Sequence, residues 1–444
     1  MASLPVTHRN RPSRWRSQSR LRPVLLIGGA LLVAVMTYGF GRLAAPLAGQ
    51  PAPGSASGAL AAEDTLQRID QAIGVWSANL ARDDADFVSA TNLADLYYSR
   101  GRLTGNVDDY ARATEAVELS LKAYPQASGA QQLRAQLLFA THDFAGALVA
   151  ARTILAAHPE QLAALATLST RSPGAAVSAR QAHLAALRGD NAEAATLAKR
   201  AIGEVMAARG TATDRSWYEY LAGYTAFQAG DLTEAQQQFQ AAVADWPGSY
   251  LATAGLARTR AAQGAMKDAI GLYQKAIAIV PQPEFLAALG DLYALGGNSA
   301  GAAAQYDLVR AIARLASVQA QVYNRQLVLF DANHGEDVAD ALALARRELA
   351  TRKDVYGWDA YAWALYANGS YADAWAAMRN ATAQRTVDPL LDYHAGMIAA
   401  ALGHADEARR LLTAALVRNP GFDPLQASRA RAALAALGSG GVRR

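Results

Sequence analysis

Cysteine is absent from all 444 residues, which excludes disulfide bonds, thiolate metal sites and a cysteine nucleophile. Lysine is almost absent as well, with five residues among the 42 basic side chains. This preference for arginine is typical of a GC-rich bacterial genome. The lack of cysteine is compatible with an oxidising compartment, although it does not require one.

Sequence motifs of common catalytic sites are also lacking. No His-Glu-x-x-His pair, no glycine-rich phosphate loop and no Gly-x-Ser-x-Gly elbow occurs. The histidines are scattered, and acidic pairs such as Asp83-Asp84 and Asp108-Asp109 suit helix N-termini better than a calcium site. We therefore expect a protein that is not an enzyme, with no catalytic residues, no metal site and no cofactor.

The first 60 residues contain no acid but seven arginines, six of them within 1–22. The uncharged, apolar stretch 23–41 follows, and it is long enough to cross a bilayer as a helix, for which about 20 residues are needed. Because arginines are retained on the cytoplasmic side, the remainder of the chain would lie on the other side. The sequence predicts a single-pass inner (cytoplasmic) membrane protein with a basic cytoplasmic tail at 1–22, a transmembrane anchor at 23–41 and a periplasmic or extracellular bulk. A cleaved signal peptide is the main alternative, which Arg42 and Pro46 disfavour.

The net charge of +4 and the pI near 9.2 come from this N-terminal region. Residues 61–444 carry 35 basic against 38 acidic side chains, which is 42 minus 7 against 38 minus 0. The basic pI therefore reflects topology, and we expect no nucleic-acid partner. Proline, glycine and serine are concentrated in 42–61, which predicts a flexible linker.

What the chain does contain is a repeat of 34 residues. Two successive periods pair as follows: Gly230 with Gly264, Ala235 with Ala269, Phe239 with Tyr273, Ala242 with Ala276, and Pro247 with Pro281. The apolar positions recur at helical spacing, so each helix buries one stripe, and the glycine allows a left-handed turn after the first helix. Since neither helix can bury its apolar face alone, successive units must stack.

Further units keep the same register. They read Leu289-Gly290, Tyr293 and Gly297, then Tyr361-Ala362, Leu365 and Gly369, then Ala395-Gly396, Gly403 and Ala408. In these residues the chain resembles the tetratricopeptide repeat (TPR) proteins, roughly from residue 85 to 420. The resemblance implies an all-α fold, a right-handed α-solenoid, and we count about nine helix-turn-helix TPR units. The predicted transmembrane helix and flexible linker precede them. The resemblance also implies peptide or protein partners on the concave face.

The repeat pattern predicts that the solenoid spans 62–420 and that 421–444 forms a C-terminal capping helix and tail. Arg429 and Arg431 give that helix a polar surface suited to the open end of a stack. Two irregularities are expected, an enlarged turn over 102–107 and an unpaired helix over 160–172.

The inner face of the superhelix holds the candidate binding residues. The inward positions of two units are Ala254, Gly255 and Arg258, and Ala287, Ala288 and Asp291. These do not resemble the basic clamp with which some TPR proteins bind acidic C-terminal peptides, and they predict a small, apolar inner face.

Aromatic residues are concentrated in 356–375. Trp363 and Tyr366 would point into the groove beside Asp359, and below Tyr393 and Met397 of the next unit. Large amphipathic aromatics in a groove are typical anchors for a partner chain, so these five residues are the predicted partner-binding site. Packing of the aromatics between Ala-rich helices is the alternative that remains open.

The predicted function is that of a membrane-anchored scaffold or adaptor for protein–protein interactions at the bacterial cell envelope. A regulatory or assembly subunit of a separate enzyme complex is an alternative. A glycan-binding protein that uses the aromatic groove is another, and the sequence does not separate the three.

Overall fold

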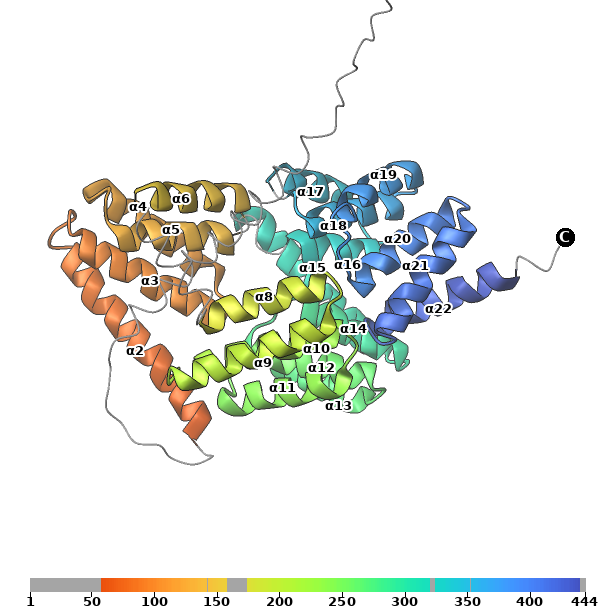
Figure 1. Ribbon diagram of the computed structural model, residues 1–444, viewed down its shortest axis with the longest axis horizontal. Helices are drawn as coiled ribbons and strands as arrows, with labels where there is room; N and C mark the ends of the chain where they lie inside the picture. Colours follow the sequence, from red (N-terminus) through yellow and green to blue (C-terminus); the bar gives the residue numbers. More distant parts are fainter. Residues whose placement is uncertain (1–56, 142, 158–173, 320–323, 352, 440–444) are drawn as a thin grey trace, which may run out of the picture.

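The computed structural model describes residues 57–141, 143–157, 174–319, 324–351 and 353–439, and these ranges are helical with no strand. Figure 1 shows a curved stack of helices coloured along the chain. The helices are α2 (Ser57–Leu80), α3 (Phe87–Thr104), α4 (Val107–Ala123), α5 (Ser128–Ala140), α6 (Phe144–Ala157), α8 (Ala175–Leu187), α9 (Asn191–Ala207), α10 (Ala212–Gln228), α11 (Leu232–Asp245), α12 (Tyr250–Ala262), α13 (Met266–Ile279), α14 (Pro283–Leu295), α15 (Ser299–Gln319), α16 (Asn324–His334), α17 (Val338–Thr351), α18 (Val355–Ala367), α19 (Tyr371–Ala381), α20 (Pro389–Ala401), α21 (Ala405–Arg418) and α22 (Pro424–Ser439).

Between α2 and α22, the described ranges contain nine helix-turn-helix pairs. In each pair the two helices pack closely on one another, from α3 with α4 and α5 with α6, through α8 with α9, to α20 with α21. The all-helical, TPR-like solenoid and the number of about nine units are thus as the sequence predicts.

The small residues of the repeat lie where helices approach most closely. Ala242 and Ala276 are fully buried, and Phe239 fills the space between units. A methyl group at Gly255 would meet the Phe239 ring at 2.5 Å, so glycine is required for this contact. Gly230 and Gly264 have φ of +83° and +80°, the left-handed conformation that glycine adopts without strain.

The superhelix closes on itself, because loops near its C-terminus touch helices in the middle of the chain. The amide of Val387 donates to the carbonyl of Leu187 at 2.8 Å. The side-chain amide of Asn419 donates to the carbonyl of Phe227 at 2.7 Å, and Gly421 packs against Ala262. Figure 1 shows the result, with the blue helix α22 lying beside α14. We call the residues 387 and 419–421 the closure loops.

Two local predictions need correction, and the predicted C-terminal helix has contacts that the sequence did not indicate. α3 continues to Thr104 and α4 begins at Val107, so the enlarged turn over 102–107 is wrong. α2 begins at Ser57, inside the segment 42–61 predicted as linker. α22 begins at Pro424, where the sequence predicts the C-terminal helix, and it packs on α14 and α20 as well as on α21. Its Arg429 guanidinium donates to the carbonyl of Asn333 at 2.8 Å, so α22 reaches back into the superhelix and does more than cover an open end.

Several predicted segments lie outside the described residues. They are the tail at 1–22, the anchor at 23–41, the part of the linker before Ser57 and the unpaired helix over 160–172. Within the described ranges, no helix has the length and apolar character needed to cross a membrane.

Candidate functional site

The concave face of the closed superhelix surrounds a cavity of about 640 Å³, which we call the chamber. Its wall comes mainly from the first helices of successive pairs, namely α10, α12, α14, α16 and α20, and from the start of α22. The chamber exists because the closure loops bring the last units opposite the middle ones. It is therefore a concave surface to which several repeat units of the described chain contribute.

The repeat register places residues on the chamber wall correctly. Ala254, Gly255 and Arg258 of α12 line it, as do Ala287, Ala288 and Asp291 of α14. The predicted chemistry of this face is wrong, however. Tyr220 and Tyr224 of α10 and Tyr356 of α18 also line the chamber, and they make its wall aromatic and polar where a small, apolar surface was expected.

Arg258 supplies a positive charge to the chamber. Its guanidinium carbon lies 5.6 Å above the ring of Phe227, and the side chain forms a hydrogen bond with Tyr273. Burial lowers the pKa of Arg258, but Glu284 and the three tyrosines Tyr273, Tyr224 and Tyr220 together raise it above its ordinary value, so the guanidinium stays charged. No carboxylate of the described residues lies within ion-pair distance of Arg258, and the same wall holds the carboxylate of Glu284.

A second positive charge, Arg325 of α16, lies at the edge of a buried polar network. Its guanidinium lies 5.0 Å from the ring centre of Tyr356, and Nη2 is 3.7 Å from the carboxylate of Asp359. The same carboxylate accepts a hydrogen bond from His394 Nδ1 at 2.7 Å. Nearby, the buried Asp388 accepts hydrogen bonds from the Tyr356 hydroxyl at 3.1 Å and from the Gln228 amide at 3.2 Å.

Three buried polar atoms of chamber-lining residues have no hydrogen-bond partner within the described chain. They are Nε of Arg325, Nε2 of His394 and Oε1 of Gln426. An unsatisfied buried polar group costs roughly 1–3 kcal/mol, and folded proteins contain few of them. Their occurrence in residues around one cavity favours a binding role for this wall.

The predicted partner-binding residues lie together, but behind the chamber wall. Trp363 is 2% exposed, stacks on Tyr366 at 4.5 Å and on His394 at 4.1 Å, and donates from Nε1 to Asn333 Oδ1 at 2.8 Å. Tyr393 and Asp359 are each 1% exposed, whereas Tyr366 and Met397 are half-buried.

None of these five residues lines the chamber. Their arrangement is the packing between units that the sequence left open as the alternative. Direct contact with a partner stays a prediction, and Tyr366 and Met397 are the members of the set with exposed surface.

Sequence reasoning missed several chamber residues. Tyr220 and Tyr224 lie 34 positions before Ala254 and Arg258, so the same register would have placed both on the inner face. Arg325 lies in an irregular unit where the register is weak, and no local signal identifies it. In the described part of the chain, no group of three or more His, Cys, Asp or Glu side chains is arranged to hold a metal ion.

Comparison with known proteins identifies a tetratricopeptide repeat in part of the chain. Residues 220–282 match the model of a tetratricopeptide repeat family. They comprise the second half of α10 and the whole of α11, α12 and α13. No curated protein matches the sequence. The helix pairs, the left-handed glycines and this family match define a TPR-like α-solenoid.

Three solved structures are similar. A tetratricopeptide repeat protein from Parabacteroides merdae ATCC 43184 is 16% identical, with 59% of this chain and 97% of that chain covered and a TM-score of 0.34. The P58(IPK) TPR domain is 12% identical over 86% of this chain and 98% of that one, with a TM-score of 0.29. A chain of the APC/C hetero-tetramer Cut9-Hcn1 is 16% identical over 77% and 76%, with a TM-score of 0.33. All three scores are low, so the shape of the chamber rests on this chain alone.

Proposed function

We propose that the protein is a scaffold or adaptor that holds an extended segment of a partner protein in the chamber. TPR proteins act through protein–protein interactions, and the family match lies in the units that supply Tyr220, Tyr224 and Arg258 to the chamber wall. The observation that carries the proposal is an aromatic concave surface that also holds the charged side chains of Arg258 and Glu284, which form no ion pair within the described residues.

The chemistry of the wall suits a polypeptide. Tyrosine side chains offer large contact areas at a small cost in conformational entropy, and aromatic and arginine residues dominate the binding energy of protein interfaces. Arg258 and Glu284 add a donor and an acceptor on neighbouring helices, and an extended peptide presents both C=O and N–H groups. A purely apolar ligand would leave these charged groups unpaired in the complex.

We also propose that residues 23–41 anchor the chain in the inner membrane of a bacterium, with the solenoid outside the cytoplasm. The arginine distribution before the apolar stretch supports this orientation. A reporter enzyme fused after Leu437 should then be active only outside the cytoplasm. Activity of a reporter that works only in the cytoplasm would reject the orientation, and recovery of a shortened soluble chain that begins near Gln50 would reject the anchor.

A site-specific photocrosslinker tests the binding role of the chamber. Gln326 lines the chamber and is half-buried, whereas Val417 is 78% exposed and does not line it. In cells producing the full chain, a crosslinker at position 326 should capture a discrete partner, and one at position 417 should not. Identification of the crosslinked protein would also separate a general adaptor from a regulatory or assembly subunit of an enzyme complex.

A pair of arginine variants completes the test. Arg258→Ala should weaken the capture from position 326, because it removes a positive charge of the wall that forms no ion pair within the described residues. Arg379→Ala is the matched control, since Arg379 is exposed on α19 and lies outside the chamber. Equal capture from positions 326 and 417, or equal effects of the two substitutions, would show that partners bind elsewhere.

A further inference from the structure

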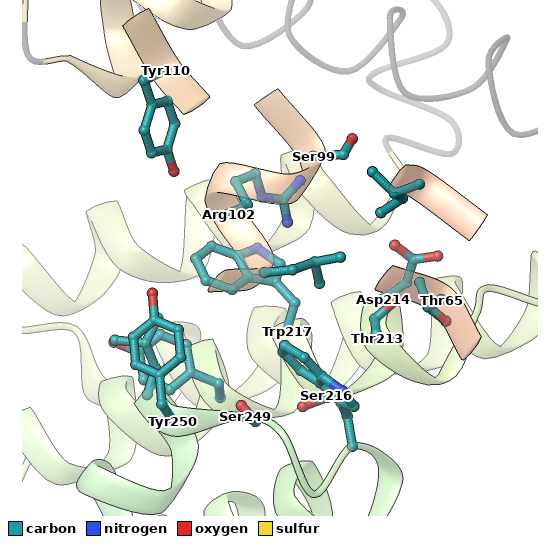
Figure 2. A pocket seen from close by; sticks show the side chains of 15 residues that line it. Thr65, Ser99, Arg102, Tyr110, Thr213, Asp214, Ser216, Trp217, Ser249 and Tyr250 are labelled. Atoms are coloured by element: carbon teal, nitrogen blue, oxygen red, sulfur yellow. The ribbon is translucent and has the colours of Figure 1, made fainter. Parts of the chain in front are cut away.

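A second pocket, of about 340 Å³, lies where helices α2 and α3 meet α10 and α12 (Figure 2). We call it the seam pocket, because it joins parts of the chain that are far apart in sequence. The turn after α3 rests on the middle of the solenoid, and a methyl group at Gly105 would lie 3.0 Å from Val280 and 3.3 Å from the Tyr250 hydroxyl. Tyr220 and Leu251 line both the seam pocket and the chamber, so the two cavities adjoin.

The lining of the seam pocket combines aromatic rings with many hydrogen-bonding groups. Of its 15 side chains, five are aromatic, and only Ile69, Leu103 and Leu251 lack a polar atom. Figure 2 shows Arg102 and Trp217 next to one another in the middle of the pocket. The guanidinium carbon of Arg102 lies 5.3 Å from the ring centre of Trp217, a distance at which cation and ring attract.

Hydroxyl groups are placed around these rings. Ser99 of α3 contributes one from one side of the seam, and Ser249, in the turn before α12, contributes one from the other, while the Thr213 hydroxyl of α10 is hydrogen-bonded to the Thr211 hydroxyl at 2.8 Å. The carboxylate of Asp214 lies in the same wall, where it accepts a hydrogen bond from the backbone amide of Thr211 at 3.0 Å. The pocket thus offers apolar ring faces together with both donors and acceptors.

This combination discriminates between ligand classes. An apolar side chain of a partner would contact the aromatic rings but would form no hydrogen bond with the hydroxyls of Ser99 and Ser249 in the same wall. A phosphate group would suit Arg102 but would be repelled by Asp214. A pyranose ring has C–H faces that can lie on aromatic rings and hydroxyls that both donate and accept around its edge.

We propose that the seam pocket binds one sugar unit of a glycan, with Trp217 as the ring platform. The volume of the pocket is at the lower end of the range for small-molecule sites, which suits one or two sugar rings. A free monosaccharide has few atoms with which to gain affinity, so we expect a dissociation constant on the order of 1 mM. The site is separate from the polypeptide binding proposed for the chamber and does not depend on it.

Saturation-transfer NMR on the full chain tests the proposal, since it detects weak ligands. The probes are glucose, N-acetylglucosamine, glucuronic acid and, as a mimic of a peptide side chain, N-acetyltyrosinamide. At least one sugar should receive saturation on its ring protons in a saturable manner. Trp217→Ala should raise the dissociation constant of that sugar at least about tenfold, as expected for loss of an aromatic anchor. Trp375→Ala is the matched control, because Trp375 packs against a core cluster of residues from α18 to α21 and lines neither cavity.

Ser99→Leu provides a second variant that leaves the buried core unchanged. Ser99 is half-buried on α3, and leucine there would occupy the pocket, so sugar binding should be lost while the melting temperature is unchanged. Binding of N-acetyltyrosinamide alone would identify a pocket for a partner's side chain and overturn the proposal. Absence of binding by all probes, or sugar binding that survives both Trp217→Ala and Ser99→Leu, would overturn it as well.

Discussion

Asn419→Ala tests whether closure of the superhelix stabilises the fold. Asn419 is fully buried, its side-chain amide donates to the Phe227 carbonyl at 2.7 Å, and its side-chain oxygen accepts from the Gly421 amide at 3.0 Å. Alanine removes both hydrogen bonds. The Phe227 carbonyl still accepts from the Gly230 amide at 3.0 Å, whereas the Gly421 amide loses a partner.

The expected cost follows from these contacts. Each buried hydrogen bond contributes about 1 kcal/mol, and a donor left without a partner in a buried site adds to the loss. We therefore expect the free energy of unfolding to fall by about 2–3 kcal/mol in urea titrations. Hydrogen exchange should also accelerate in residues 226–232, although they lie about 190 positions from the substitution.

Asn380→Ala is the matched control. Asn380 is exposed, and its amide donates to the Ala376 carbonyl within the same helix at 3.2 Å, so its removal should change stability by no more than about 0.5 kcal/mol. Equal costs for the two substitutions, or unchanged exchange in residues 226–232, would mean that the closure loops touch the middle helices without stabilising them.

Three further predictions concern packing, protonation and the predicted aromatic site. Ala276→Leu and Ala242→Leu place extra methylenes at fully buried helix crossings, so each should lower the free energy of unfolding by about 1–3 kcal/mol. Hydrogen exchange should accelerate more over residues 216–310 than near residue 130, and uniform acceleration along the chain would contradict a modular stack. Burial, followed by the charge of Asp245, raises the pKa of Glu219 to about 7, so the folded state keeps a proton that the unfolded state loses near its ordinary value of 4.5. Stability should therefore fall as pH rises from about 4.5 to about 7, and Glu219→Gln should reduce this fall by about 1–3 kcal/mol in urea titrations at the two ends of the range; an unchanged pH profile would exclude Glu219 as its source. Trp363→Ala should lower the free energy of unfolding by about 3–5 kcal/mol, since the side chain is buried. Tyr366→Ala should weaken partner binding if the exposed part of Tyr366 contacts the partner. A folded Tyr366→Ala variant with unchanged affinity would show that Tyr366 only packs between units.

The local part of the fold could be predicted from the sequence because one repeat is one packing unit. Gly230 and Gly264 mark the turns, and the buried alanines mark the helix crossings. The error over 102–107 arose because Gly101 occupies the expected turn position. In the structure Gly101 is a helical residue on which a methyl group would lie 3.1 Å from the Tyr110 ring, and Gly105, with φ of +68°, makes the turn instead.

The binding surface could be predicted only in part. The repeat register correctly placed Arg258 and Asp291 on the inner wall. It could do so because the position of a residue within its own repeat unit decides whether its side chain faces inward. Burial of Trp363 depends on α22, whose Ala427 and Ala430 pack in the same cluster, and nothing periodic in the sequence places α22 there. The closure loops likewise depend on single contacts, such as Val387 with Leu187, across some 200 residues.

For the partner segment proposed to lie in the chamber, closure would also separate the affinity of binding from the rate of exchange. In an open groove, a bound segment leaves sideways as soon as its own contacts break. In the closed chamber, a segment leaves along the axis or waits until the contacts of Val387 and Asn419 open. The residence time of a bound segment would then depend on how often the closure-loop contacts open. Two partners of equal affinity but different length would therefore dissociate at different rates.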